Sequence, residues 1–327
     1  MERPRAVDGP SPARTILTLT PNPTLDRVIF VRHFRLGAVV RGEREVVTPS
    51  GKGVDSSLVI HELGGATVAS GLNAGRSGRL LVELLAERGI AHDFVPAHGE
   101  TRTAVVLVDL AVNQQSTITA PTLGAREEHL TQLLALLDRH AERAWGLICA
   151  GSLPPGLPAD SYARLLRHAR QRGLIALLDT SGEALCAGVA GRPHILKVNQ
   201  DEVASLDRGG ARAPETLADL ASILAGRLGR WASDALIVTL GERGALALTP
   251  GGNYYVRPPA VPTVNTAGAG DALNAGIMLA RSRGADWPAA LALGTAAAAS
   301  VVMNEGTAIC RREQVEELLP RVQVLQP

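Results

Sequence analysis

The segment "NTAGAGDALNAG" (265–276) places a turn of small residues directly before an acid and a helix. Gly268 and Gly270 flank Ala269 and lead into Asp271, and the apolar spacing that follows predicts a helix starting near Gly268. A helix N-terminus presents unpaired N–H groups and a partial positive charge, so it is suited to binding an anion. The structural alternative is a tight strand-to-helix connection, with Asp271 as a first-turn acid that the helix dipole favours.

Two familiar phosphate-binding motifs do not describe this segment. The dinucleotide pattern G-x-G-x-x-G requires glycine at position 273, which is Leu273, and it is expected near the first strand of the fold. A P-loop requires serine or threonine after its lysine, but the Gly-Lys pair at 51–52 is followed by Gly53. Any phosphate chemistry at this turn is therefore of another type.

Short apolar runs alternate with longer helical patterns along the chain. Buried parallel strands are expected from continuous apolar or β-rich runs at 15–20, 145–151, 174–179, 194–198 and 235–240. Amphipathic helices are expected at 79–89, 126–143, 159–173 and 215–229, and an Ala-rich buried helix at 289–303. This alternation predicts an α/β fold with a doubly wound, mostly parallel sheet and helices on both faces.

Two segments break the alternation. Residues 26–47 and 101–120 alternate like strands and contain no convincing helix, so they predict a small β-sheet that stands off the α/β body as a lid. The organisation expected from these patterns is a loose leader over 1–14, followed by one domain over 15–327. The apolar run at 289–303 is shorter than the roughly 20 residues that a membrane span needs.

Composition excludes several classes of partner. The formal net charge is +1, from 33 basic and 32 acidic residues, so no global field attracts nucleic acid or an anionic membrane. Any anion must then be held by local groups. Cys149, Cys186 and Cys310 are far apart and lack metal-ligand spacing, which is typical of core cysteines in a reducing, cytoplasmic compartment.

The "NTAGAGD" turn resembles the D/N/S-T-x-G-A-G-D hallmark of the PfkB/ribokinase family of sugar kinases. The resemblance extends from about residue 15 to residue 320 through seven further segments in family order. These segments are "LTPNPTLDR", "PSGKGVDSSLVIHELGG", "GETRTAVVLV", "AGSLPPGLP", "LLDTSGEAL", "KVNQDE" and "VTLGERGAL". The late "NEGTAIC" points to the phosphosugar branch, whose members act on fructose 1-phosphate, fructose 6-phosphate or tagatose 6-phosphate.

The resemblance implies a ribokinase-like fold and a role for each matching residue. Asp271 would be the general base, and the amides of Ala267, Gly268, Ala269 and Gly270 would hold the γ-phosphoryl group of ATP. Asn199 and Glu202 would hold Mg²⁺ through water; the alternative is a polar loop followed by a surface acid. The residues expected to line the ATP site are Lys197, Thr239 and Gly241. Those expected to face the acceptor sugar are Asp26, Gly51, Lys52, Gly53, Asp55, Arg102 and Ser152.

Two residues depart from the family pattern. Ser50 stands where the first glycine of the glycine-rich signature is usual, and Asp55 stands where asparagine is usual. Asparagine both donates and accepts hydrogen bonds, whereas an ionised aspartate only accepts. An anion at position 55 also disfavours a nearby phosphate unless Lys52 or Arg102 neutralises it.

The resemblance therefore implies an ATP- and Mg²⁺-dependent kinase of a ketohexose phosphate, with a monovalent cation as a further possible cofactor. Arg102 would contact the acceptor's phosphate; the alternative is that it pairs with Glu100 or Asp109 on the lid. A kinase of a free sugar or nucleoside, or an idle metabolite sensor of the same fold, stays open as an alternative function. An apolar lid face predicts a homodimer formed through the lid.

Overall fold

The computed structural model describes residues 14–112, 114–206 and 217–326. The expected leader lies outside the described residues except for Arg14, as do the first two residues of the helix expected at 215–229. Within the described ranges no helix is both long and apolar enough to cross a lipid bilayer.

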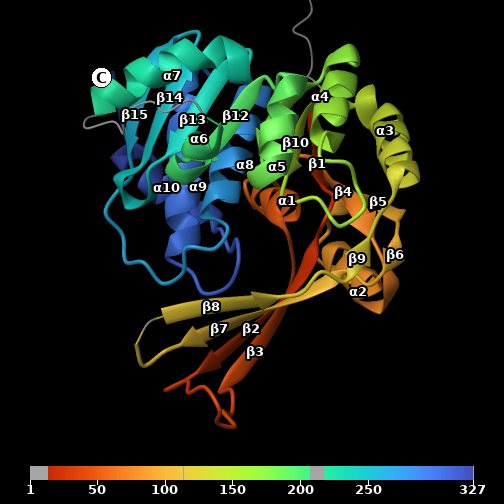
Figure 1. Ribbon diagram of the computed structural model, residues 1–327. Helices are drawn as coiled ribbons and strands as arrows, with labels where there is room; N and C mark the ends of the chain where they lie inside the picture. Colours follow the sequence, from red (N-terminus) through yellow and green to blue (C-terminus); the bar gives the residue numbers. More distant parts are fainter. Residues whose placement is uncertain (1–13, 113, 207–216, 327) are drawn as a thin grey trace, which may run out of the picture.

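A large sheet forms the centre of the molecule (Figure 1). Its strand order is β16-β15-β14-β13-β12-β11-β10-β1-β4-β5, and every pairing from β5 to β13 is parallel. The last three strands form antiparallel pairings at one edge. The strands of this sheet are β1 (Thr15–Thr20), β4 (Thr67–Asn73), β5 (Ala91–Pro96), β10 (Ala144–Ala150), β11 (Ile175–Asp179), β12 (Ile195–Asn199), β13 (Ala235–Thr239), β14 (Ala245–Thr249), β15 (Gly252–Arg257) and β16 (Gln323–Leu325).

Helices cover both faces of this sheet, which confirms the predicted doubly wound α/β fold. The helices are α1 (Lys52–Glu62), α2 (Gly75–Glu87), α3 (Glu127–Ala141), α4 (Ser161–Gln171), α5 (Gly182–Gly188), α6 (Gln200–Leu206), α7 (Leu217–Trp231), α8 (Ala269–Ser282), α9 (Trp287–Val302) and α10 (Arg312–Leu318). Leu17 and Leu19 of β1 point into a core with α3, α4, α5 and α7. Ile16 points to the opposite face, into a core with α1, α8, α9 and α10. Alternation along one strand therefore feeds two separate cores.

Strand β4 is buried although its sequence, "TVASGLN", does not read as an apolar run. Its hydroxyl groups bond to the neighbouring strand: Ser70 Oγ donates to Thr18 O at 2.7 Å, and Thr67 Oγ1 donates to Ile16 O at 2.9 Å. A buried hydroxyl is tolerated when it is hydrogen-bonded. The apolar pattern therefore failed to predict this strand.

The two segments predicted as a lid pair in one small sheet that stands apart from the main body (Figure 1). Its order is β3-β2-β7-β8, and the strands are β2 (Thr24–Val31), β3 (Arg44–Ser50), β7 (Arg102–Asp109) and β8 (Gln114–Thr119). Several apolar side chains here are exposed: Ile118 of β8 by 66%, and Leu36 and Val39, between β2 and β3, by more than 90%.

Helices α8 and α9 meet backbone to backbone. A Cβ added at Gly276 would lie 2.5 Å from Gly294 Cα, and one added at Gly294 would lie 2.6 Å from Leu273 O. Both distances are shorter than any ordinary van der Waals contact, so only glycine fits at either position. This contact fixes the position of α8, and the first turn of α8 carries Asp271.

Candidate active site

The turn before α8 has the geometry of an anion site. Gly268 caps the helix with a φ of 86°, a conformation that favours glycine, and a Cβ there would lie 2.6 Å from Ala308 N. Of the four expected amides, that of Ala267 already donates to Asn265 Oδ1 at 2.9 Å, and that of Ala269 donates to Thr266 O at 3.3 Å. Across the described residues, the amides of Gly268 and Gly270 have no backbone or side-chain acceptor. The free donors are thus fewer than the sequence predicted.

Asp271 lies in the first turn of α8 and is 7% exposed. Its Oδ1 is buried without a hydrogen-bond partner among the described residues. Burial and the negative charge of Asp179 raise the pKa of Asp271 to about 7, against the opposing charges of Lys52 and Lys197. A carboxylate that titrates near neutrality can accept a proton from a hydroxyl group during a reaction.

Asp179, at the carboxyl end of β11, joins groups that the sequence assigned to different ligands. Its Oδ1 accepts from Lys52 Nζ at 2.6 Å, and its Oδ2 accepts from Lys197 Nζ and Asn274 Nδ2, both at 2.7 Å. Burial would raise the pKa of Asp179, but the two lysines outweigh it and hold the pKa below its ordinary value. A Cβ at Gly270 would lie 2.9 Å from Lys197 Nζ, so this cluster contacts the turn before α8.

Sequence reasoning missed Asp179 and Asn274. The available signal was an acid at the end of the apolar run at 174–179, because parallel strands end at the same edge of a sheet. The Lys52 ammonium group, expected to face the acceptor sugar, forms an ion pair with Asp179 in this structure.

A second group of carboxylates lies on the side of the small sheet. Asp26 of β2 accepts a hydrogen bond from Thr307 Oγ1 at 2.8 Å, and Asp55 of α1 accepts one from Ser50 Oγ at 3.2 Å. One oxygen of each carboxylate is buried without a partner in the part of the chain that the structure describes. Unpartnered buried acceptors are rare in folded proteins and are suited to ligand hydroxyls.

Arg102 begins β7 beside these acids. Its Nη2 donates to Asn22 O at 3.3 Å, and its Nε is buried without a partner among the described residues. Burial lowers its pKa, and the charge of Asp26 opposes that effect. The alternative pairings are absent: Glu100 accepts from the amides of residues 76 and 77, and Asp109 accepts from those of residues 33, 34 and 111.

The remaining residues expected at the acceptor lie in a loop or at the start of α1. Ser152 Oγ accepts a hydrogen bond from Asn22 Nδ2 at 3.2 Å. Gly51 precedes α1 with a φ of 113°, and a Cβ at Gly53 would lie 2.5 Å from Thr20 Oγ1. Gly51 and Gly53 therefore bring the start of α1 against the end of β1.

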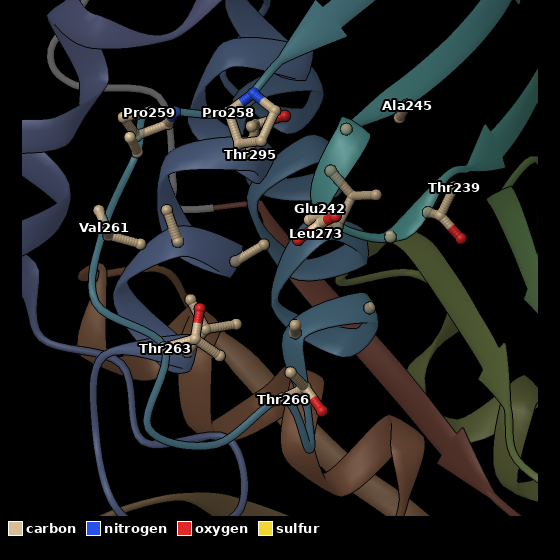
Figure 2. A pocket seen from close by; sticks show the side chains of 18 residues that line it. Thr239, Glu242, Ala245, Pro258, Pro259, Val261, Thr263, Thr266, Leu273 and Thr295 are labelled. Carbon is tan, nitrogen blue, oxygen red and sulfur yellow. The ribbon is translucent and has the colours of Figure 1, made fainter.

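A cavity of about 700 Å³ borders the turn before α8 (Figure 2). Its walls include Thr239 and Gly241, as expected for the ATP site, together with Ala269 and Gly270. The other walls come from the segment 258–263 and from α9. Lys197 is not among the lining residues, because it points to Asp179.

Asn199 and Glu202 form a reciprocal pair at the start of α6. The Asn199 amide donates to Glu202 Oε2, and the Glu202 amide donates to Asn199 Oδ1, both at 2.8 Å. This is the geometry of a helix capping box, so both side chains have a structural role. Burial lowers the pKa of Lys52, but the charges of Asp179 and Asp271 and, more weakly, that of Glu202 raise it, which links Glu202 to the Asp179 cluster.

Comparison with known proteins identifies the family to which this chain and its site residues belong. A family model described as pfkB family carbohydrate kinase matches residues 22–314. The chain belongs to the pfkB family. Within this pfkB kinase the match contains the turn, both carboxylate groups and the whole cavity lining. The resemblance seen in the sequence motifs is thereby confirmed.

The relatives of this pfkB kinase are similar over almost their full length. It is 30% identical to the ATP-dependent 6-phosphofructokinase isozyme 2 of Mycobacterium tuberculosis, over 97% of this chain and 91% of that protein. It is 28% identical to the 1-phosphofructokinase of Vibrio cholerae, over 95% of this chain and 96% of that protein. The crystal structure of phosphofructokinase-2 from Escherichia coli in complex with potassium superposes with a TM-score of 0.86 at 28% identity, over 94% of this chain and 99% of that one.

Proposed function

We propose that this pfkB kinase transfers the γ-phosphoryl group of ATP to a hydroxyl of a ketohexose phosphate: fructose 6-phosphate, fructose 1-phosphate or tagatose 6-phosphate. The observation that carries the proposal is the position of Asp271. Asp271 follows Gly270 of the cavity wall and acts through its charge on Asp55. It has an unpartnered, buried carboxylate oxygen and a pKa of about 7. The phosphofructokinase names of its relatives support the acceptor class.

The chain's own residues supply most of what phosphoryl transfer needs. Asp271 accepts the proton of the acceptor hydroxyl, and the free amides of Gly268 and Gly270 stabilise charge on the transferred group. Lys52 and Lys197, fixed by Asp179, place two positive charges beside the same turn. Asp26 and Asp55 accept hydrogen bonds from the acceptor's hydroxyls through their unpartnered oxygens.

We infer a cytoplasmic location from the reducing compartment that the cysteines indicate.

The residues at the start of α6 fit Mg²⁺ bound through water. The Asn199 and Glu202 side chains each use one oxygen within their reciprocal pair, and both residues lie at the surface. Mg²⁺ keeps several of its waters in proteins, so outer contacts of this kind are sufficient. Bound there with ATP, the ion would neutralise phosphate charge. We also expect a monovalent cation, a proposal supported by the potassium in the E. coli phosphofructokinase-2 structure.

A panel of acceptors tests the proposed function. ATP turnover should be stimulated by one of the three ketohexose phosphates at least about tenfold more than by fructose, ribose or adenosine, because a dianionic acceptor gains charged hydrogen bonds. Arg102→Ala should reduce kcat/KM for that acceptor, with little change in the KM of ATP. The reduction should correspond to a loss of about 1.5–3 kcal/mol of transition-state stabilisation, the scale of a charged hydrogen bond.

Other outcomes of the panel are equally clear. If a free sugar or nucleoside is preferred by tenfold and Arg102→Ala has no effect, the phosphosugar assignment is wrong and the kinase assignment stands. Binding of a sugar without any turnover would identify the sensor alternative.

We further propose that two copies pair through the small sheet, because Ile118, Leu36 and Val39 are left exposed there. The prediction is a dimer at micromolar concentration by sedimentation, and a shift to monomer in Ile118→Glu. The control is Val264→Glu, because Val264 is also exposed but lies outside this sheet. Ile309 is not used for this purpose, because its side chain lies close to Gly306. A fully active wild-type monomer would contradict the proposal. A related E. coli phosphofructokinase-2 structure is described as a tetrameric inhibited form, so the sedimentation analysis should also distinguish a dimer from a tetramer.

A further inference from the structure

The two departures from the family signature contact each other. Ser50 Oγ lies 3.2 Å from Asp55 Oδ2, so the serine and the aspartate that replace glycine and asparagine form one hydrogen-bonded pair. Asp55 is 3% exposed, and its Oδ1 has no partner among the described residues. An ionised carboxylate in that position would hold a buried charge with little compensation.

The charged groups around Asp55 make its ionisation unfavourable. The two groups that act on it most strongly are Asp26 from β2 and Asp271 from α8, and both are acids. The nearby cations serve other acids: Arg102 acts on Asp26, while Lys52 and Lys197 hold Asp179 and also act on Asp271. Burial and the two neighbouring acids together raise the pKa of Asp55 well above its ordinary value. Among the described residues, no cation is therefore one of the groups that act most strongly on Asp55.

We infer that Asp55 is a neutral carboxylic acid in the working enzyme and contacts the acceptor as an asparagine would. The inference rests on the proposed function, because it concerns the acceptor site of the same reaction. It assigns the shared proton of the neighbouring acids to Asp55, which leaves Asp271 free to act as the base.

Ser50 provides a hydrogen-bond acceptor for the proton on Asp55. Burial raises the pKa of Asp26, and hydrogen bonding from Thr307 and then from the Ser50 hydroxyl opposes this effect. One hydroxyl has one proton, so it cannot donate to two carboxylates at once. When Asp55 is protonated, its O–H donates to Ser50 Oγ, and the Ser50 O–H donates to Asp26. Asp55 Oδ1 then remains an uncharged acceptor for a sugar hydroxyl and does not repel the phosphate of the acceptor.

Infrared difference spectroscopy of the whole enzyme tests the proton directly and without turnover. The wild type minus Asp55→Asn spectrum, recorded well above pH 7 so that Asp271 is ionised, should contain the carbonyl stretch of a protonated carboxyl group, with its shift in heavy water. The wild type minus Asp271→Asn spectrum is the matched control and should lack that band. A band that disappears with Asp271→Asn instead, or no protonated band at all, would overturn the inference.

Acceptor kinetics test the consequence for recognition. Asp55→Asn keeps a donor toward Ser50 and a neutral acceptor toward the sugar, whereas Asp55→Ala keeps neither. The acceptor KM of Asp55→Asn should therefore be at least about tenfold lower than that of Asp55→Ala. The wild type should also bind its acceptor more weakly as pH rises and Asp55 ionises, and Asp55→Asn should lose this dependence.

Each result has a distinct meaning. If Asp55→Asn and Asp55→Ala are equally impaired, then position 55 requires a carboxylate and the inference is wrong. If no acceptor supports turnover in the wild type, the proposed function fails, while the infrared result still decides where the proton is.

Discussion

Asp271→Asn is expected to lower kcat by about 10²–10⁴-fold while ATP binding is retained, because the variant cannot accept the proton of the acceptor hydroxyl. The measurement is steady-state turnover with the preferred acceptor, together with ATP binding by calorimetry. Gly270 and the cavity walls are unchanged in the variant, so the nucleotide site should remain intact. A variant that keeps most of its kcat would show that another group takes the proton.

The pKa of Asp271 gives the same experiment two further readouts. Because the base must be ionised, kcat/KM of the wild type should fall about tenfold for each pH unit below about 7. Since folding raises this pKa, the native state binds the proton more tightly than the unfolded chain does. The stability that this acid contributes therefore decreases as pH rises from its ordinary pKa to about 7. Asp271→Asn should accordingly have a higher Tm than the wild type at neutral pH, which distinguishes a lost base from a damaged fold.

Asp179→Asn should have the largest effect on stability, about 3–5 kcal/mol less free energy of unfolding, since it leaves Lys197 buried without its counter-charge. The same change should lower kcat, because Lys52 loses the group that holds it. Asp138→Asn is the matched control. That exposed acid also bonds two basic side chains, His168 and Arg172, and its loss should cost about 0–1 kcal/mol.

Denaturant unfolding with both variants measures the difference. Equal stabilities would mean that water replaces Asp179 as the partner of the lysines.

The charge of Asp179 also predicts acid sensitivity. Its pKa is lowered on folding, so the stability that it contributes is lost as pH falls below the ordinary range of an aspartate.

Sequence patterns predicted the parts of the fold that rest on local periodicity. The turn at 265–276, helix α9 and the strands β1, β10, β11, β12 and β13 are found within one or two residues of their expected positions. Strand β4 was not predicted, because its burial depends on hydroxyl groups bonding to a strand about fifty residues earlier. Helix α1 was covered by a quoted motif but not by an apolar period.

The site was predictable as a set of motifs and not as a network. Each motif names residues that face a ligand, so Lys52 and Lys197 were assigned to different ligands. Their meeting on Asp179 arises only when the carboxyl ends of β11 and β12 and the start of α1 come together. The contact of Ser50 with Asp55 was not predictable for a similar reason. A substitution within a signature motif does not show which neighbouring side chain forms a hydrogen bond with the new residue.

The glycine contact between α8 and α9 has a consequence for how such an enzyme can diversify. Adding a single methyl group at Gly276 or Gly294 pushes one backbone into the other, and the resulting shift is transmitted to the helix that carries Asp271. The acceptor side is built differently, from strands and loops such as those that carry Asp26, Ser50 and Thr307. Substitutions in the small sheet and its loops can therefore change the acceptor during evolution. Substitutions of the glycines between α8 and α9 displace the catalytic helix and are not tolerated.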